Sequence, residues 1–397
     1  MSKEKRRVPK LRFPGFTEDW EQYRLDELLI ERSILCTQSE KYPLVSFTVE
    51  RGVTPKTERY NREALVVGNK ASKKYKLTLM DDIVYNPANL KFGAIARNKY
   101  GKAVFSPIYV TLEVKSDRII SDFLEYILTS KSFINKALRY QQGTVYERQS
   151  VNVESFLLQT INIPTVNEQI AISNLLYKYD KIISIYKHKL VVLNLKKKAL
   201  LQKLFPKQGA TCPTLRFPGY TDDWEQRKFK DIAFKRGKIS EADLPYVEFE
   251  DINSGIGTLN KNILQKVGHK KGILFETGDV LFGKLRPYLQ NWLLCQFRGI
   301  AVGDFWVLQP QNVSSVFLYY LIQSEAYQSV ANISSGTKMP RSSWSLVSET
   351  QFSISKYNEA NMIGEFFSSI DKNITLHQRK LEHLQLQKKS LLQQMFV

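Results

Sequence analysis

Hydrophobic residues recur at alternating intervals of four and three residues in two stretches of the chain, 172–204 and 363–395. A sustained 3-4 spacing places side chains along a single seam and predicts long helices that wind around each other as a left-handed coiled coil. The apolar seam positions are Ile172, Leu176, Tyr179, Ile183, Tyr186, Leu190, Leu193, Leu200 and Leu204 in the first stretch, and Ile363, Phe367, Ile370, Ile374, Leu381, Leu384, Leu391 and Met395 in the second.

Three polar side chains interrupt these seams. Lys197 and Lys388 stand at matching positions, and His377 matches Tyr186. A polar residue in a seam often fixes the register of the pairing, while long lysine stems can equally extend outward into water. Each helix could also pack only on its own domain, but two seams of equal length and register favour mutual pairing.

Short runs rich in β-branched and aromatic residues alternate with helical patterns in two other segments, roughly 24–163 and 228–355. The predicted strands cover 43–49, 64–67, 83–85, 103–114, 246–249, 279–282 and 300–308, and the predicted helices cover 122–138 and 314–330. The sequence therefore predicts an α+β protein in which two mixed α/β domains are separated and followed by long helices. We expect domains at 1–164 and 207–355 and coiled-coil helices at 165–206 and 356–397.

The chain is also an internal repeat with matching ends. The string LRFPGFTEDWEQ at 11–22 returns as LRFPGYTDDWEQ at 215–226, and the two predicted helices close on LLQKLF and LLQQMF. Between these ends the two halves barely resemble each other. The chain is thus a pseudo-two-fold repeat whose ends are constant and whose intervening segments differ. Such a protein is suited to recognising two different targets at a fixed separation.

Charge narrows the choice of partner. The 397 residues hold 58 Lys and Arg against 39 Asp and Glu, a net charge of +19, which favours a polyanionic partner over a protein that is basic by drift. No apolar run approaches the ~18–20 residues of a membrane span, so nucleic acid is preferred. The polar, basic segment 1–10 does not resemble a signal peptide, so Cys36, Cys212 and Cys295 are expected to be reduced thiols in a cytoplasmic protein. Their wide separation argues against a zinc site.

Motifs for catalysis are incomplete. Asn86-Pro87-Ala88-Asn89 resembles the loop with which adenine methyltransferases hold a flipped base, but Ala88 breaks the pattern and Asn89 replaces the stacking aromatic residue. The turn 255–257 is too isolated to bind S-adenosylmethionine, and the nuclease-like run 113–115 matches by chance. We therefore predict no catalytic or metal-binding residues. A self-contained adenine-N6 DNA methyltransferase with a degenerate motif is one alternative, and a coiled-coil adaptor for protein contacts is another.

Basic residues alternate with Tyr, Asn and Gly in the divergent segments. Lys and Arg neutralise phosphates, whereas Arg, Asn and Gln can pair with base edges in the major groove. Any one of these side chains could be an ordinary solvated charge, but as a set they favour DNA reading. The candidates are Lys70, Lys73, Lys74, Tyr75, Asn86, Arg97, Lys99, Lys102, Gly143, Thr144, Tyr146 and Arg148, then Lys284, Arg286, Tyr288, Gly336, Thr337, Lys338 and Arg341.

The framing residues resemble those of a known family. The pattern Leu-Arg-Phe-Pro-Gly-aromatic-x3-Trp occurs twice, and Pro164-x3-Glu168-Gln169-x2-Ile172 opens the first long helix. In these features the whole chain is similar to the specificity (S) subunit of type I restriction–modification enzymes. The resemblance implies two target-recognition domains that each read one half of a bipartite, asymmetric DNA site. It also implies that the two helices pair antiparallel and set the spacer, and that the subunit has no catalytic activity.

The same resemblance implies partners and cofactors. Two methyltransferase (modification) subunits would dock on the chain and methylate adenine with S-adenosylmethionine, and ATP-dependent restriction/translocase subunits would join them. No cofactor is expected in this chain, because S-adenosylmethionine, ATP and Mg would belong to the partners. One departure is notable: Ser355 and Ala360 stand where the first copy has Pro164 and Gln169, so we expect the second junction to be weaker or differently built.

Overall fold

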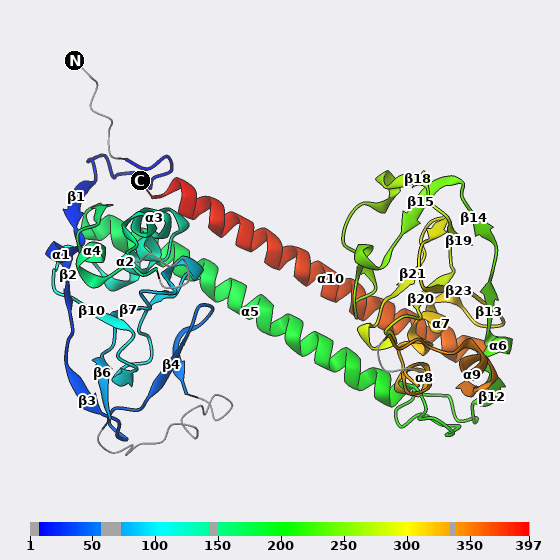
Figure 1. The fold of residues 1–397 in the computed structure, drawn as a ribbon. Coiled ribbons are helices and arrows are strands. Elements are labelled where there is room, and N and C mark those ends of the chain that lie inside the picture. Colours follow the sequence, from blue (N-terminus) through cyan, green and yellow to red (C-terminus); the bar gives the residue numbers. More distant parts are fainter. Residues whose placement is uncertain (1–7, 57–72, 143–148, 334–338, 397) are drawn as a thin grey trace. The chain divides into compact units, whose positions relative to one another are not determined.

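The computed structural model describes residues 8–56, 73–142, 149–333 and 339–396. The chain divides into two compact units. Unit 1 contains Met1–Ile185 and Leu381–Val397, and unit 2 contains Tyr186–Lys380. Both long helices cross this division, so each unit holds a part of each helix together with one set of strands and short helices (Figure 1).

An antiparallel four-stranded sheet lies at the centre of unit 1. Its strand order is β2 (Leu29–Glu31), β10 (Val110–Val114), β7 (Ile83–Tyr85) and β8 (Ile95–Arg97). Side chains from this sheet form one core with the helices α1 (Leu25–Leu28), α2 (Ser121–Leu128), α3 (Lys131–Ala137) and α4 (Val153–Leu157). The smaller sheets are β1 (Glu21–Arg24) with β11 (Thr160–Ile163), β3 (Leu35–Thr37) with β6 (Lys74–Thr78) and β9 (Ala103–Phe105), and β4 (Val45–Thr48) with β5 (Gly52–Pro55).

Unit 2 repeats the central sheet with the same topology. The strand order is β13 (Ala233–Arg236), β23 (Phe305–Pro310), β20 (Val280–Gly283) and β21 (Trp292–Leu294). The helices of its core are α6 (Phe229–Ile232), α7 (Ser315–Leu321), α8 (Glu325–Ala331) and α9 (Trp344–Glu349), and β12 (Glu225–Lys228) pairs with β24 (Gln351–Ile354).

A second core in unit 2 belongs to a five-stranded sheet. The strand order is β14 (Ile239–Ser240), β19 (Gly272–Phe275), β22 (Gly299–Ala301), β15 (Asp243–Val247) and β18 (Val267–His269), and β16 (Ile252–Asn253) pairs with β17 (Thr258–Leu259) nearby. Strands β15 and β22 run parallel, whereas the other neighbours in this sheet run antiparallel. The contents of the two units therefore differ although their central sheets match.

The long helices are α5 (Val166–Leu204) and α10 (Tyr357–Gln394). In unit 1 the beginning of α5 shares a core with the end of α10, through Leu176 and Met395. In unit 2 the end of α5 shares a core with the beginning of α10, through Leu204 and Phe367. The helices therefore run antiparallel within each unit. All of the apolar seam residues are buried or half-buried, as are Lys197, His377 and Lys388.

Two long predicted helices are each interrupted. The structure has α2 and α3 within 122–138, and α7 and α8 within 314–330. The break comes at a serine that caps the second helix: Ser130 Oγ accepts a hydrogen bond from Phe133 N at 3.1 Å, and Ser324 Oγ accepts one from Tyr327 N at 3.3 Å. The predictions of single strands at 103–114 and 300–308 are also wrong, because a turn divides each into two strands. The strand predicted at 64–67 lies outside the described residues.

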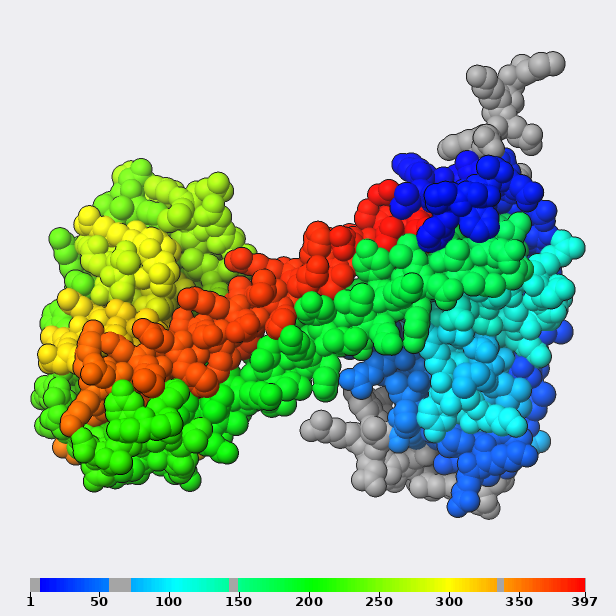
Figure 2. Space-filling view, turned by 180° about the vertical axis from the view of Figure 1, so that it is seen from behind, coloured from blue at the N-terminus to red at the C-terminus, as the bar shows by residue number. Residues whose placement is uncertain are grey.

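The repeated string at the start of each half joins the long helices. Leu11 N donates to Gln394 O at 2.9 Å in unit 1, and Leu215 N donates to Lys203 O at 2.9 Å in unit 2. Trp20 packs against Phe396, as Trp224 packs against Phe205. Figure 2 shows the blue N-terminal segment lying against the red end of α10. The two repeats therefore make one junction twice.

A bidentate ion pair anchors each junction to the N-terminal turn of a long helix. Arg12 contacts Glu168 with both N···O distances at 2.8 Å, and Arg216 contacts Glu359 at 2.7 and 2.8 Å. Both glutamates are almost fully buried. In each pair, the hydrogen bond to the glutamate is the main reason that the pKa of the arginine is raised above its ordinary value.

The neighbouring residue explains how the second junction differs. Gln169 accepts a hydrogen bond from Ile120 N at 3.0 Å and donates to Arg118 O and Pro164 O at 2.7 and 2.9 Å. Ala360 cannot form these bonds and is instead packed in the core of unit 2, 1% exposed. The second junction keeps the ion pair and replaces the amide network with apolar packing.

Candidate nucleic-acid interface

A β-hairpin of the central sheet projects from the same place in each unit: β7–β8 in unit 1 and β20–β21 in unit 2. A buried aspartate precedes the first strand of each hairpin. Asp82 pairs with Arg32 at 2.9 Å, and Asp279 pairs with Arg236 at 2.7 Å. Each aspartate also accepts a backbone N–H bond, at 2.8 and 2.7 Å. Buried charges are stabilised by such pairing, so both hairpins rise from a rigid base.

The hairpin tip of unit 1 contains a single 3-10 turn, Leu90–Phe92. Phe92 is 65% exposed, and Lys91 Nζ lies 5.3 Å from the centre of its ring. Gly93 ends the turn at φ = 82°, a left-handed conformation that costs glycine little. The tip therefore presents an aromatic ring and a cation on a fixed turn.

The hairpin tip of unit 2 has the same plan with different side chains. Its 3-10 turn is Pro287–Leu289, and Tyr288 is 57% exposed. Arg286 and Gln290 flank the turn at φ = 49° and 59°. A left-handed conformation costs a non-glycine residue about 1–2 kcal/mol, and such strain persists where the surroundings hold it. Here Arg286 N donates to Pro340 O at 2.7 Å.

Several of the residues predicted in unit 1 lie on its surface. Lys73, Lys74, Lys99 and Lys102 are exposed, although Lys99 Nζ also contacts Glu125 at 2.8 Å. These four side chains can reach a phosphate. Five other candidates, Lys70, Gly143, Thr144, Tyr146 and Arg148, lie outside the described residues.

Three candidates in unit 1 have structural positions instead. Tyr75 is buried, 6% exposed, with Lys73 above its ring. Asn86 is also 6% exposed, and its side-chain oxygen accepts hydrogen bonds from the two backbone N–H groups of a turn, Ala88 and Asn89. A side chain in such a position holds the loop that contains it and is not available to a base edge.

Arg97 is enclosed by acidic side chains. Its guanidinium contacts Asp81 at 2.8 Å, Asp122 at 2.6 Å and Glu125 at 3.3 Å. The side chain is only 13% exposed. Arg97 therefore links strand β8 to helix α2, and its charge is already balanced.

The candidates in unit 2 cluster beside the hairpin tip. Lys284 and Arg341 share Asp304, at 3.3 and 3.0 Å. Arg286 is exposed and forms no ion pair with any residue that the structure describes. Gly336, Thr337 and Lys338 lie outside the described residues. Arg286 and Tyr288 are thus the side chains of this group with the fewest internal partners.

Two features of these surfaces were missed by the sequence reasoning. Lys91 and Phe92 are adjacent in the chain and follow the strand predicted at 83–85. A basic residue beside an aromatic one in a turn could therefore have indicated this tip from the sequence. Lys235 Nζ lies 4.8 Å from the ring of Trp344, and burial lowers its pKa, with Lys284 adding a smaller effect. That pair is distant in sequence, so nothing local indicated it.

The motifs that suggested catalysis have structural partners. Glu113 of the nuclease-like run pairs with Arg32 at 3.0 Å, beside Asp82. Ile256 N and Gly257 N of the isolated glycine turn donate to Asn253 O. Within the described ranges, no cluster of His, Cys, Asp and Glu could hold a metal, and no helix is long and apolar enough to cross a membrane.

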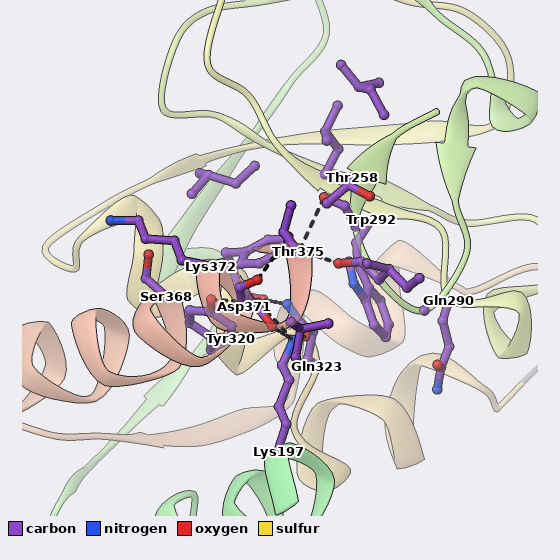
Figure 3. Close-up of a pocket in the computed structure, with 18 of the residues that line it drawn as sticks. Lys197, Thr258, Gln290, Trp292, Tyr320, Gln323, Ser368, Asp371, Lys372 and Thr375 are labelled. Carbon is purple, nitrogen blue, oxygen red and sulfur yellow. Dashed lines mark hydrogen bonds and ion pairs between the residues drawn. The ribbon is translucent and has the colours of Figure 1, made fainter. Parts of the chain in front are cut away.

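A cavity of 1240 Å³ lies in unit 2 between α5, α7, α10 and the loop that contains residues 255–264 (Figure 3). Lys197 lines it and contacts Asp371 at 2.8 Å, and Tyr320 OH donates to Asp371 at 2.8 Å. Lys197, Asp371 and Tyr320 thus bind one another at the wall of the cavity. In unit 1 the equivalent Lys388 contacts Asp180, and Tyr126 OH donates to Asp180 at 2.9 Å. Both seam lysines therefore pair across the seam and do not extend into water.

One α+β frame is built twice, with different basic and aromatic side chains on matching hairpins, and this defines a protein with two matching domains whose exposed tips differ. The model of the type I restriction modification DNA specificity domain matches residues 17–195 and 221–386, and the chain belongs to this family. It is therefore a DNA-specificity subunit, the non-catalytic component of type I restriction–modification complexes, and the alternative of a self-contained methyltransferase is not favoured.

Relatives and solved structures agree with this placement. The chain is 22% identical over 317 residues to the type I restriction enzyme MjaVIII specificity subunit of Methanocaldococcus jannaschii, covering 73% of each protein. The crystal structure of the S subunit of a type I restriction-modification system from M. genitalium superposes with a TM-score of 0.57 at 16% identity, over 98% of this chain and 99% of that chain. A chain from a study of complex assembly and conformational transition of the type I R-M system gives 0.56 at 14% identity, over 96% and 97%. These structures share the fold.

Proposed function

We propose that each unit of this subunit reads one half of a bipartite DNA target and that α5 and α10 set the spacer between the halves. The observation that carries the proposal is the duplication itself. The junction of Arg12 with Glu168 is repeated by Arg216 with Glu359, while the hairpin tips carry different side chains. A constant frame with divergent reading surfaces supports the recognition of two different sequences.

The proposed recognition domains are residues 1–164 and 207–355, and the proposed helical elements are 165–206 and 356–397. In the first domain, the exposed Lys73, Lys74, Lys99 and Lys102 are proposed to contact phosphates. In the second domain, Arg286 is proposed to contact a base edge beside Tyr288, since an arginine with no internal ion pair among the described residues can pair bidentately with guanine. Tyr75, Asn86 and Arg97 are left out of this surface because their side chains are buried or already paired.

The chain is further proposed to act in the bacterial cytoplasm, in a complex with two methyltransferase subunits and with ATP-dependent restriction subunits. S-adenosylmethionine, ATP and Mg would be bound by those partners. This division of labour is supported by family membership and by the structural partners of the motifs at 86–89 and 113–115.

The test is a domain exchange. Residues 228–355 are replaced by the matching segment of another family member, and the methylated DNA sequences are mapped with the methyltransferase partner present. We expect one half-site to change and the other to stay the same. If both half-sites stay unchanged, or if both change, the two segments do not read independently and the proposal fails.

A further inference from the structure

We propose that a polar cluster, present once in each unit, fixes the register of α5 against α10 and thereby the length of DNA spacer that the protein accepts. We call each cluster a register lock. The members are Lys197, Asp371 and Tyr320 in unit 2, and Lys388, Asp180 and Tyr126 in unit 1. This inference rests on the proposed function, because it concerns the spacing of the two half-sites.

In unit 2 the lock joins three helices. Lys197 of α5 places Nζ 2.8 and 2.9 Å from the two carboxylate oxygens of Asp371 on α10. Tyr320 of α7 donates its hydroxyl to Asp371 at 2.8 Å, and its ring centre lies 5.3 Å from Lys197 Nζ. Gln323 accepts a further bond from Lys197 at 3.2 Å. Lys197 is 8% exposed, and Figure 3 shows these four side chains converging.

Unit 1 contains the same cluster with the two long helices in exchanged roles. Here α10 supplies the lysine, Lys388, and α5 supplies the aspartate, Asp180. Tyr126 of α2 donates to Asp180 at 2.9 Å, and its ring centre lies 5.2 Å from Lys388 Nζ. The arrangement therefore occurs twice at equivalent positions, which points to a role in the frame that both units share.

Apolar residues occupy most positions of both seams, so apolar contacts alone leave other registers open. If α5 slid by one heptad, about 10 Å along the helix axis, Leu190 or Leu204 would replace Lys197 beside Asp371. Most other seam positions would still place one apolar side chain against another, so apolar packing discriminates less between registers than a charged pair does. Lys197, 8% exposed, would then lie in the seam without its carboxylate partner, which is unfavourable for a charged group so far from water. The lock therefore penalises the shifted register more than it stabilises the native one.

The tyrosine extends this effect to the recognition domain. Tyr320 lies on α7, whose residues Phe317 and Leu318 belong to the core of unit 2 together with Trp306 of the central sheet. A hydrogen bond from α7 to Asp371 thus ties the sheet that carries the hairpin to the two paired helices. Tyr126 makes the same connection through α2, which shares a core with Ile83 and Leu112. In each unit, the central sheet and its hairpin are in this way connected to the paired helices by a tyrosine hydrogen bond.

A purely stabilising role predicts a different behaviour. Replacing a buried ion pair by apolar residues of similar volume is often neutral for stability. The double variant K197L/D371L would therefore fold while losing the polar discrimination between registers. A stabilising pair would lower activity on all targets alike, whereas a register lock would change the relative activity on targets with different spacers.

The experiment uses the full chain assembled with its methyltransferase partners and a set of targets whose spacers differ from the native one by one to three base pairs. The range includes three because a slip of one heptad, about 10 Å, matches about three base pairs at ~3.4 Å each. For the wild type, we expect the rate of methylation to fall sharply when the spacer is longer or shorter than the native one. For K197L/D371L we expect the preference for the native spacer to drop by about tenfold, equivalent to about 1.4 kcal/mol, with unchanged base preferences in both half-sites. K388L/D180L is expected to give a smaller broadening through unit 1, because the Asp180 side chain is 43% exposed.

Two further variants keep the result interpretable. Y320F removes one hydrogen bond and leaves the ion pair, so a smaller broadening is expected even if the double variant fails to fold. K356A removes an exposed pair with Asp222 in unit 2 and should leave the spacer profile unchanged. Unaltered profiles in folded K197L/D371L and in Y320F would overturn the register lock. A wild type without any spacer preference would instead overturn the proposed function.

Discussion

Units 1 and 2 make the same junction and hold different contents, and the turn before each hairpin illustrates how. In unit 1 this turn contains Asp81 at φ = 69°, whose carboxylate also pairs with Arg97. In unit 2 the matching residue is Gly278 at φ = 89°. Asp81 tolerates a left-handed conformation and also forms an ion pair, whereas Gly278 adopts it without strain. The backbone path is kept while the side chains are exchanged.

The junctions differ in the same sense. Both keep a bidentate arginine–glutamate pair, but only unit 1 surrounds it with the hydrogen bonds of Gln169. Unit 2 packs Ala360 in apolar surroundings and adds a five-stranded sheet. The connection to the long helices and the central sheet are therefore kept in both units, whereas the smaller sheets and the side chains of the hairpin tips vary.

The largest expected effect comes from breaking one junction at a time. Arg216→Ala leaves the carboxylate of Glu359, 1% exposed, buried without its partner, so unfolding of unit 2 should become easier by about 3 kcal/mol. Arg12→Ala should do the same to unit 1. Hydrogen exchange followed by mass spectrometry assigns the loss to each unit. Lys271→Ala, which removes an exposed pair in unit 2, is the control, and equal loss of protection in both units would contradict the comparison.

A smaller effect should separate the two junctions. Gln169→Ala leaves Ile120 N and the carbonyls of Arg118 and Pro164 without their partner, so unit 1 should lose about 2 kcal/mol in chemical denaturation. Gln385→Ala, exposed on α10, should change little. The reverse substitution Ala360→Gln should destabilise unit 2 by about 1–3 kcal/mol through overpacking. A gain in stability would show that the second junction lacks only the amide.

Substitutions of basic residues in the two units should affect DNA binding in different ways. Arg286→Ala should weaken discrimination at one base pair by about 1–3 kcal/mol, and only in the half-site read by unit 2. Lys102→Ala in unit 1 should instead weaken binding to all sequences and reduce the slope of log K against log salt by about 0.9. Binding assays on single-base variants at several salt concentrations measure both. A uniform loss across sequences for Arg286→Ala would assign it to a phosphate.

The smallest effect concerns the helix breaks. Ser130→Ala removes the cap of α3 in unit 1 and should cost about 1 kcal/mol in thermal or chemical unfolding. Ser324→Ala should cost a similar amount in unit 2. Ser132→Ala, exposed within α3, serves as the control. If Ser130→Ala matched this control, the break between α2 and α3 would depend on packing and not on the cap.

The long helices and the α+β class could be predicted because their signals are periodic and local. The spacing of Leu176 and Leu204 reports one face of a helix wherever the helix lies. The helix breaks were missed because a serine cap is a weak signal inside an apolar pattern. The reading surface was predicted only in part, since composition cannot distinguish an exposed Lys102 from an Arg97 enclosed by three carboxylates. That distinction depends on side chains brought together from distant parts of the chain.

The junction between Leu11 and Gln394 has a consequence for the order of events during synthesis. All residues of unit 2 have been made once Lys380 has been added, and its equivalent bond joins Leu215 to the nearby Lys203. Unit 1 starts first on the ribosome, yet its core includes Leu391 and Met395. Unit 1 is therefore translated first, but its core is completed after that of unit 2. The apolar surface around Trp20 stays uncovered until Phe396 has been synthesised and can pack against it.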